Sequence, residues 1–204
     1  MDDPGRLPGA RDVRVTLEGD DNHRVVVALP PHPQMGGDRR DSRLRAVSDA
    51  LTDAAVDCLR IDYGPWDEGV GERTDAITAL EWATDRYEQV GLFGYSFGGA
   101  VALFAATEVE TANNLEDVQT VAVSALAPAA GSVAGFDPED IDRIQCPGQV
   151  IFGDRDDTAD WQSVVERARE LRWHVESISA DHFFVSQQTR VADLVTSFFA
   201  TQLS

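Results

Sequence analysis

The sequence predicts an α/β fold, with a mostly parallel sheet of about seven strands and helices on both faces. Two observations support this prediction. Short apolar runs of strand length alternate along the chain with longer stretches in which apolar residues recur every three to four positions. Such alternation is typical of parallel sheets, because each crossover helix packs back onto the sheet. The length of 204 residues, 43% of them hydrophobic, suits one domain with a sizeable core.

The chain begins with a segment that differs in composition from the rest. Residues 1–11 are rich in Pro, Gly and charge, which predicts a flexible N-terminal tail and one domain over residues 12–204. Residues 13–17 then alternate polar and apolar side chains, which predicts a half-exposed edge strand. Residues 25–29 form a continuous apolar run, which predicts a strand covered on both faces.

The remaining elements follow in alternation. Strand-like runs occupy residues 58–61, 90–93, part of 118–126, 149–152 and 174–178. Between and after them, helical spacing of apolar or small residues occurs over residues 44–55, 77–87, 98–106, 161–171 and 191–199. These runs complete the predicted strands and their connecting helices.

The charge excludes several classes of partner. All 17 basic residues are Arg, and 36 acidic residues give a net charge of −19. We expect binding neither to nucleic acid nor to a membrane surface, because both are anionic. The acidic N-terminus and the lack of a long apolar run lead us to expect a cytoplasmic protein. The absence of Lys resembles the composition of proteins from extreme halophiles, in which hydrated carboxylates dominate the surface.

The most specific motif is Gly94-Tyr95-Ser96-Phe97-Gly98-Gly99, between an apolar strand and a helix of small residues. This is the context of a nucleophile elbow, in which a strained turn exposes a serine Oγ at the carboxyl end of a sheet. Glycines two positions before and after the serine leave room for the turn. The pattern does not match the G-x-G-x-x-G fingerprint, and a P-loop needs a Lys that the chain lacks.

A serine nucleophile needs a base and an orienting carboxylate, which follow this elbow in the order acid, then His. Of the histidines after Ser96, His174 begins a strand, whereas His182 lies in a loop after the last strand, so we favour His182 as the base. For the acid we favour Asp156 in the loop after residues 149–152. Asp154 and Asp157 remain alternatives, the latter also as a helix cap.

Two backbone N–H groups should form an oxyanion hole. Phe97 follows the nucleophile and supplies one. The loop after residues 25–29 should supply the other, and Gln34 is its first donor beyond the His-Pro pair, because proline has no N–H. His32 either orients this loop or is a solvated loop residue.

These motifs resemble the α/β-hydrolase superfamily, specifically its small capless members related to dienelactone hydrolases. The strongest matches are His32-Pro33 with Gly36-Gly37, the elbow, the segment Gly153 to Asp156, and residues 181–184. The resemblance implies a Ser96–Asp156–His182 triad. Dienelactone hydrolase itself uses Cys as the nucleophile, so its substrate is not implied. The segment 62–66 lacks the Arg found in relatives.

Relatives often carry a cap before the last strands, but the corresponding stretch here is short and interrupted by Pro and Gly. We therefore expect no cap, at most a short helix around residues 138–144, and an open site. Tyr95, Trp66, Phe183 and Met35 are candidates to line it.

The expected function is that of a serine hydrolase that cleaves a small carboxylic ester without cofactor or metal. A thioesterase or acyltransferase with the same triad, and a catalytically silent binding or scaffold protein, remain alternatives.

Overall fold

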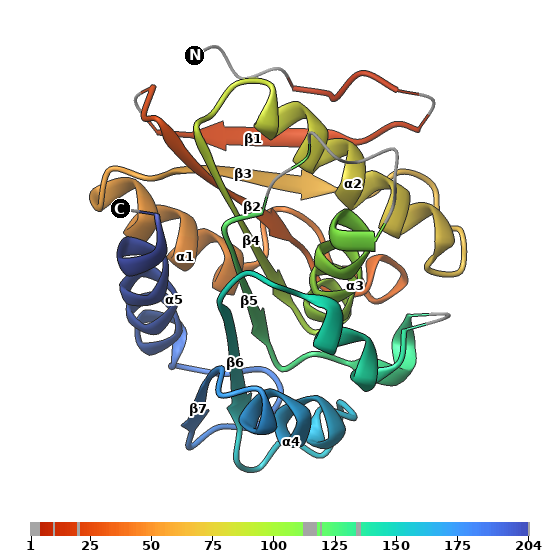
Figure 1. Cartoon of the computed structure of the whole chain (residues 1–204), viewed down its shortest axis with the longest axis vertical. Helices are drawn as coiled ribbons and strands as arrows, with labels where there is room; N and C mark the ends of the chain where they lie inside the picture. The colour runs from red at the N-terminus through yellow and green to blue at the C-terminus, as the bar shows by residue number, and fades with distance from the viewer. Residues whose placement is uncertain are drawn as a thin grey trace.

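The computed structural model describes residues 5–9, 11–19, 21–111, 118, 120–133 and 136–203. Within these residues, seven strands form one sheet (Figure 1). In chain order they are β1 (Arg14–Glu18), β2 (Arg24–Leu29), β3 (Asp57–Asp62), β4 (Gln89–Tyr95), β5 (Ala122–Leu126), β6 (Gly148–Gly153) and β7 (His174–Ile178). Their order in space is β1-β3-β2-β4-β5-β6-β7. Only the pairing of the edge strand β1 with β3 is antiparallel, so the predicted mostly parallel sheet is confirmed.

Helices cover both faces of this sheet. On one face α1 (Ser42–Asp53) lies beside α5 (Gln188–Gln202), as Figure 1 shows. On the other lie α2 (Val70–Thr84), α3 (Phe97–Thr111) and α4 (Gln162–Glu170). Each face has its own buried apolar cluster, and the two clusters divide the inward side chains of the strands between them. The alternation of side chains along a strand produces this division.

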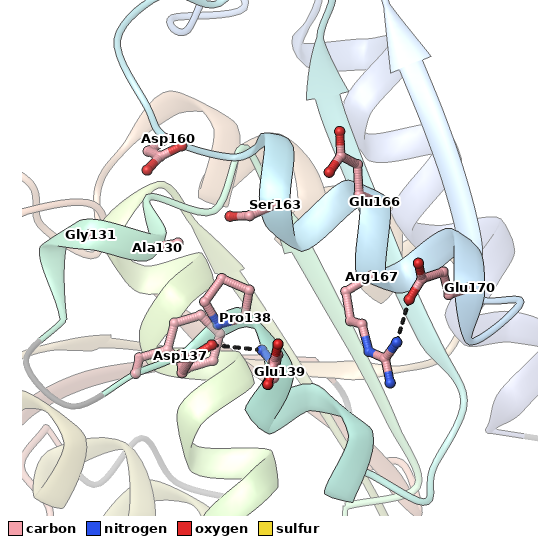
Figure 2. Close-up of a pocket in the computed structure, with 11 residues that line it drawn as sticks. Ala130, Gly131, Asp137, Pro138, Glu139, Asp160, Ser163, Glu166, Arg167 and Glu170 are labelled. Carbon is pink, nitrogen blue, oxygen red and sulfur yellow. Dashed lines mark hydrogen bonds and ion pairs between the residues drawn. The ribbon is translucent and has the colours of Figure 1, made fainter.

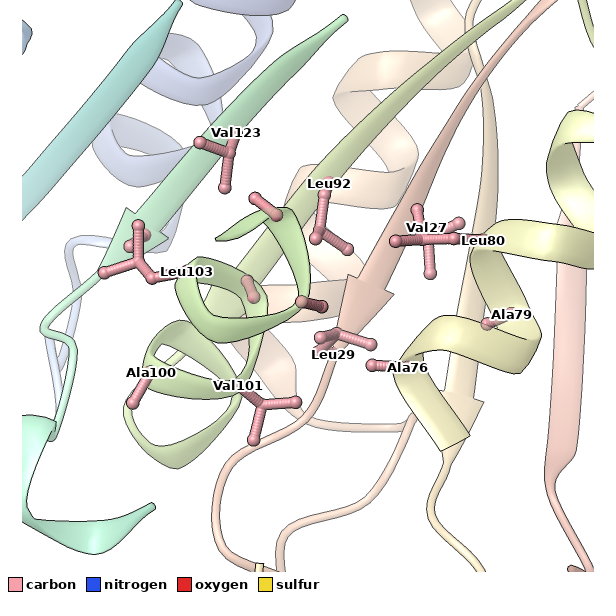
Figure 3. Close-up of a cluster of buried hydrophobic side chains, with 14 of the residues drawn as sticks. Val27, Leu29, Ala76, Ala79, Leu80, Leu92, Ala100, Val101, Leu103 and Val123 are labelled. Atoms are coloured by element: carbon pink, nitrogen blue, oxygen red, sulfur yellow. The ribbon is translucent and has the colours of Figure 1, made fainter. Parts of the chain in front are cut away.

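The central helix α3 packs closely on the sheet because its inward residues are small. Its buried positions include Gly98, Gly99, Ala100, Ala102 and Ala105. Figure 3 shows the side chains of β2, β4 and β5 meeting those of α2 and α3 in one apolar layer. Close packing fixes the start of α3, where the elbow lies.

The N-terminal segment that was expected to be a flexible tail makes contacts with the domain. Leu7 is 6% exposed, and its N–H donates to the carbonyl of Val13. Arg11 Nε donates to Asp75 of α2 at 2.6 Å. Contacts with the domain therefore begin before residue 12, while residues 1–4 and 10 lie outside the described part of the chain.

The structure changes the expected start of α2, the expected cap of α4 and the type of the short helix near residue 140. The helix α2 begins at Val70 rather than near 77, because Gly71, Glu72 and Asp75 in its first turns are buried and so hide the apolar pattern. The helix α4 begins at Gln162, with Trp161 rather than Asp157 at its N-cap. The short helix expected around residues 138–144 is a 3₁₀ helix, η3 (Pro138–Arg143).

The connection between β5 and β6 contains no cap in its described residues. It holds two 3₁₀ helices, η2 (Ala130–Ser132) and η3. Its Ile141 and Ile144 are buried against the core, which keeps the connection close to the body of the domain. Nowhere in the described ranges is there a helix with the length and apolar character needed to cross a bilayer.

Candidate active site

The predicted elbow is a tight turn between β4 and α3. Ser96 has φ = 57°, in the left-handed region that non-glycine residues seldom adopt. A Cβ on Gly94 would overlap the carbonyl of Gly98, and a Cβ on Gly98 would overlap backbone oxygens at the end of β2. The two glycines are therefore required for the approach of these backbones. The Ser96 N–H donates to the Leu126 carbonyl at 2.8 Å, which ties the strained residue to β5.

The structure brings Ser96, His182 and Asp156 into one hydrogen-bonded chain. Ser96 Oγ lies 2.9 Å from His182 Nε2, and His182 Nδ1 lies 2.8 Å from Asp156 Oδ2. The three residues come from the loops after β4, β6 and β7, whose carboxyl ends lie at one edge of the sheet. All three are at most 8% exposed. A neutral imidazole with its proton on Nδ1 would present a lone pair to the serine hydroxyl.

Asp156 is held in place by its second carboxylate oxygen. Asp156 Oδ1 accepts the N–H groups of Thr158 and Ala159 at 2.9 and 3.1 Å. Of the alternatives, Asp154 has a half-exposed side chain 3.7 Å from Arg155, and Asp157 is exposed. Only Asp156 among these three contacts the imidazole.

Two side chains from other parts of the chain, Tyr95 and Arg43, donate hydrogen bonds to the loop that carries His182. Tyr95 donates its hydroxyl proton to the His182 carbonyl at 2.9 Å. Burial raises the pKa of Tyr95, so the hydroxyl remains a donor at neutral pH. Arg43 Nη1 donates to the Phe183 carbonyl at 3.0 Å, and its guanidinium lies over the Tyr95 ring, 4.6 Å from the centroid. Sequence reasoning missed Arg43, and the only local signal is the capping Asp41 before α1.

The proposed oxyanion donors differ in their present partners. The Phe97 N–H lies at the first position of α3, where the helix offers no acceptor. The Gln34 N–H donates to His32 Nδ1 at 3.3 Å, within the short 3₁₀ helix η1 (Pro33–Met35) that His32 caps. Partial burial lowers the pKa of His32, so this ring is neutral and can accept at neutral pH. Of the two roles that the sequence left open for His32, this bond favours the one in which His32 orients the loop.

A cavity of about 350 Å³ opens at Ser96. Tyr95, Met35 and Phe183 line it, as expected, and Met35 and Phe183 are 83% and 54% exposed at its rim. Trp66, which was also expected there, is not among the lining residues, and neither is Gln34. Trp66 packs against two residues that do line the cavity, with its ring centroid 4.5 Å from that of His32 and 5.8 Å from that of Phe97.

A larger hollow of about 490 Å³ lies between η2, η3 and α4 and shares no lining residue with the cavity at Ser96 (Figure 2). Its charged lining is mainly acidic, and Arg167 pairs there with Glu170. Over the described ranges, no three His, Cys, Asp or Glu side chains are grouped so as to hold a metal ion. No hydrogen-bonded pair of nucleophile and base lies among the residues described around this hollow, whereas Ser96 and His182 form such a pair at the other cavity.

Comparison with known proteins gives relatives of low identity. No protein-family model matches the sequence. An uncharacterised protein of Rickettsia prowazekii (strain Madrid E) is 23% identical over 215 residues, which cover 97% of this chain and 85% of that protein.

Solved structures match over nearly the whole chain. An α/β serine hydrolase homologue from Coxiella burnetii has a TM-score of 0.78 at 20% identity, covering 97% of this chain and 98% of the other. An α/β serine hydrolase without a lid from Xanthomonas campestris has a TM-score of 0.71 at 22% identity, covering 96% and 94%. A dienelactone hydrolase from Anabaena variabilis has a TM-score of 0.73 at 22% identity, covering 95% and 94%. With its seven-stranded, mostly parallel sheet flanked by helices, the chain has the α/β-hydrolase fold, and the described residues between β5 and β6 add no cap to it.

Proposed function

We propose that this protein is a serine hydrolase that cleaves a carboxylic ester through an acyl-enzyme on Ser96. The observation that carries the proposal is the hydrogen-bonded chain from Ser96 through His182 to Asp156 at a strained elbow beside an open cavity. Nucleophile, base and orienting acid in this geometry are the parts that acyl transfer needs.

In the proposed reaction, Ser96 Oγ attacks the ester carbonyl while His182 Nε2 takes the hydroxyl proton. Asp156 stabilises the imidazolium through the Nδ1–H bond. The tetrahedral intermediate collapses as His182 gives its proton to the leaving alkoxide, which departs as the alcohol. Water then attacks the acyl-enzyme with His182 again as base, and releases the carboxylic acid and free Ser96.

We propose the N–H groups of Phe97 and Gln34 as the oxyanion donors. The Gln34 N–H would turn from His32 Nδ1 to the oxyanion as negative charge develops. The bond that it would give up is long, 3.3 Å, whereas a bond to an anion is shorter and about twice as strong. The exchange therefore favours the intermediate over the free enzyme.

The choice of an ester rests on a structural comparison and on the residues at the rim of the cavity. A similar structure is that of a dienelactone hydrolase, and a lactone is a cyclic ester. The apolar rim formed by Met35 and Phe183 suits a small acyl group. Thioester cleavage or acyl transfer would use the same residues, and a silent binding protein would use none of them.

A fluorophosphonate probe, which phosphonylates activated serines, tests the proposal in high-salt buffer. We expect the wild type and S163A, which changes an exposed serine of α4, to be labelled, and S96A to be unlabelled. Labelling of S96A would refute the nucleophile assignment. Folded wild-type protein that resists both the probe and p-nitrophenyl esters would favour the silent binding protein.

The composition supports a proposal about working conditions. A net charge of −19 with Arg as the only basic residue type suits a surface hydrated at high salt, where ions screen the repulsion. We therefore propose a halophilic enzyme whose partner is a small neutral molecule rather than a polyanion.

A further inference from the structure

Two side chains of opposite charge form a polar wall of the cavity at Ser96. Asp41 and Arg43 both line it, and they pair through two hydrogen bonds, from Nε to Oδ1 at 2.9 Å and from Nη2 to Oδ2. Their side chains are only 9% and 16% exposed. The pair therefore places no net charge on the wall of the cavity.

Three of the five N–H donors of the Arg43 guanidinium are already in use. Nε and Nη2 donate to Asp41, and Nη1 donates to the Phe183 carbonyl. One face of the group lies over the Tyr95 ring. A substrate carboxylate that takes the Nε and Nη2 donors must displace Asp41, and one that takes the Nη1 donor must release the loop that carries His182; the two N–H donors that remain belong to a group whose charge Asp41 already compensates.

The rest of the cavity offers an anion no other cation. Arg43 is the only Arg among the lining residues, and burial keeps His32 neutral at neutral pH by lowering its pKa. His182 is committed to Asp156 and Ser96. The apolar side chains of Met35, Phe97 and Phe183 complete the surface available to an acyl chain.

From this arrangement we infer that the site accepts esters with an uncharged, apolar acyl group and rejects acyl groups that end in a carboxylate. The inference rests on the proposed function and names its substrate class. The discriminating element is Asp41, which neutralises Arg43. A carboxylate left in the cavity without a free cation loses hydration without compensation, which costs about 100-fold in kcat/KM.

The first test compares two p-nitrophenyl esters of equal chain length on the wild type. One is the hexanoate, and the other is the mono-ester of adipic acid, which ends in a carboxylate. We expect kcat/KM to be about 100-fold lower for the adipate, with S96A supplying the uncatalysed rate. The ratio of kcat/KM between the two esters is measured at low and at high salt. High salt screens the repulsion between the net charge of the protein and the adipate, so the difference that remains there belongs to the cavity.

The second test frees the guanidinium with D41N. Asp41 also caps α1 by accepting the Arg43 N–H at 2.9 Å, and asparagine caps helices as well. We expect the adipate-to-hexanoate ratio of kcat/KM to rise about tenfold, because Arg43 gains the capacity for a charged hydrogen bond. The matched control is D38N. It also removes one negative charge, three positions before Asp41, but the Asp38 side chain does not line the cavity. It should leave the ratio unchanged.

Each outcome decides one question. Equal cleavage of both esters by the wild type at high salt overturns the inference even if D41N does not fold. An equal change of the ratio in D38N and D41N also overturns it, because the effect would then belong to the overall charge. If folded wild-type protein cleaves neither ester, the proposed function is refuted and this inference with it.

Discussion

Replacing Asp156 by Asn tests the central contact of the site with a minimal change in shape. Asp156 Oδ2 accepts from His182 Nδ1 at 2.8 Å, while Oδ1 accepts two backbone N–H groups. An asparagine keeps its oxygen on the two backbone donors, because turning its amide toward them would place donors against donors. Its NH₂ group then faces His182 Nδ1, which must become the acceptor.

The expected loss of rate follows from that change of tautomer. With Nδ1 as acceptor, the neutral ring of His182 carries its proton on Nε2, which faces Ser96 Oγ at 2.9 Å. It then cannot accept the serine proton, and kcat should fall by about 10⁴-fold. Stability should change far less, by about 1–3 kcal/mol for one charged hydrogen bond, since both backbone donors stay paired. In a chain of this length, 1 kcal/mol shifts Tm by about 2–4 °C.

The assay is the hydrolysis of a p-nitrophenyl ester in high-salt buffer, with Tm measured on the same samples. D154N and D157N are the matched controls, because both change exposed carboxylates of the same loop. We expect the controls to retain their rate within about twofold. A D156N variant that keeps its rate, or a D154N variant that loses as much, would refute the assignment of the acid. A D156N variant that unfolds would refute the argument that the two backbone bonds survive.

Three further predictions concern the elbow, the oxyanion loop and the surface. G94A should lower the free energy of unfolding by about 1–3 kcal/mol and abolish ester cleavage, because the new Cβ overlaps the Gly98 carbonyl; melting curves and rates check both. His32 has a lowered pKa, so the stability that its neutral ring gives to the loop is present above its ordinary pKa of 6.5 and is lost as pH falls through the lower folded value. The fall of Tm toward acid should therefore be smaller in H32N, since asparagine can accept the Gln34 N–H without titrating. Dilution from molar salt to about 0.05 M should lower Tm if the charge of −19 opposes the compact state, and an unchanged Tm would contradict the halophilic proposal.

The order of strands and helices could be predicted because its signals are local. Residues 25–29 form a continuous apolar run, and in the structure β2 lies between β3 and β4 with both faces covered. Residues 14–17 of the alternating run belong to the edge strand β1. The meeting of Ser96, Asp156 and His182 could be predicted for a similar reason, since parallel strands bring the loops at their carboxyl ends together.

The polar wall of the cavity could not be predicted, because its contacts join distant parts of the chain. Asp41 and Arg43 look like ordinary residues at the start of an amphipathic helix. The target of Arg43 is a carbonyl 140 positions away, in the loop that carries His182. A backbone acceptor has no signature in the sequence, so nothing in the pattern of side chains points to this contact.

The misplaced Trp66 has a similar cause, which begins in the supposed tail. Arg11 donates to Asp75 and to the Pro65 carbonyl, and a Cβ on Gly71 would overlap its guanidinium. The loop before α2 is thereby held against the domain, and Trp66 packs against the rings of His32 and Phe97 rather than lining the cavity. Composition suggested that residues 1–11 make few contacts, because proline, glycine and charge favour exposure. Arg11 nevertheless packs against the domain, because the buried Asp75 carboxylate accepts its bond and Gly71 leaves room for its guanidinium. Because these residues are far apart in the sequence, their match is visible only in three dimensions.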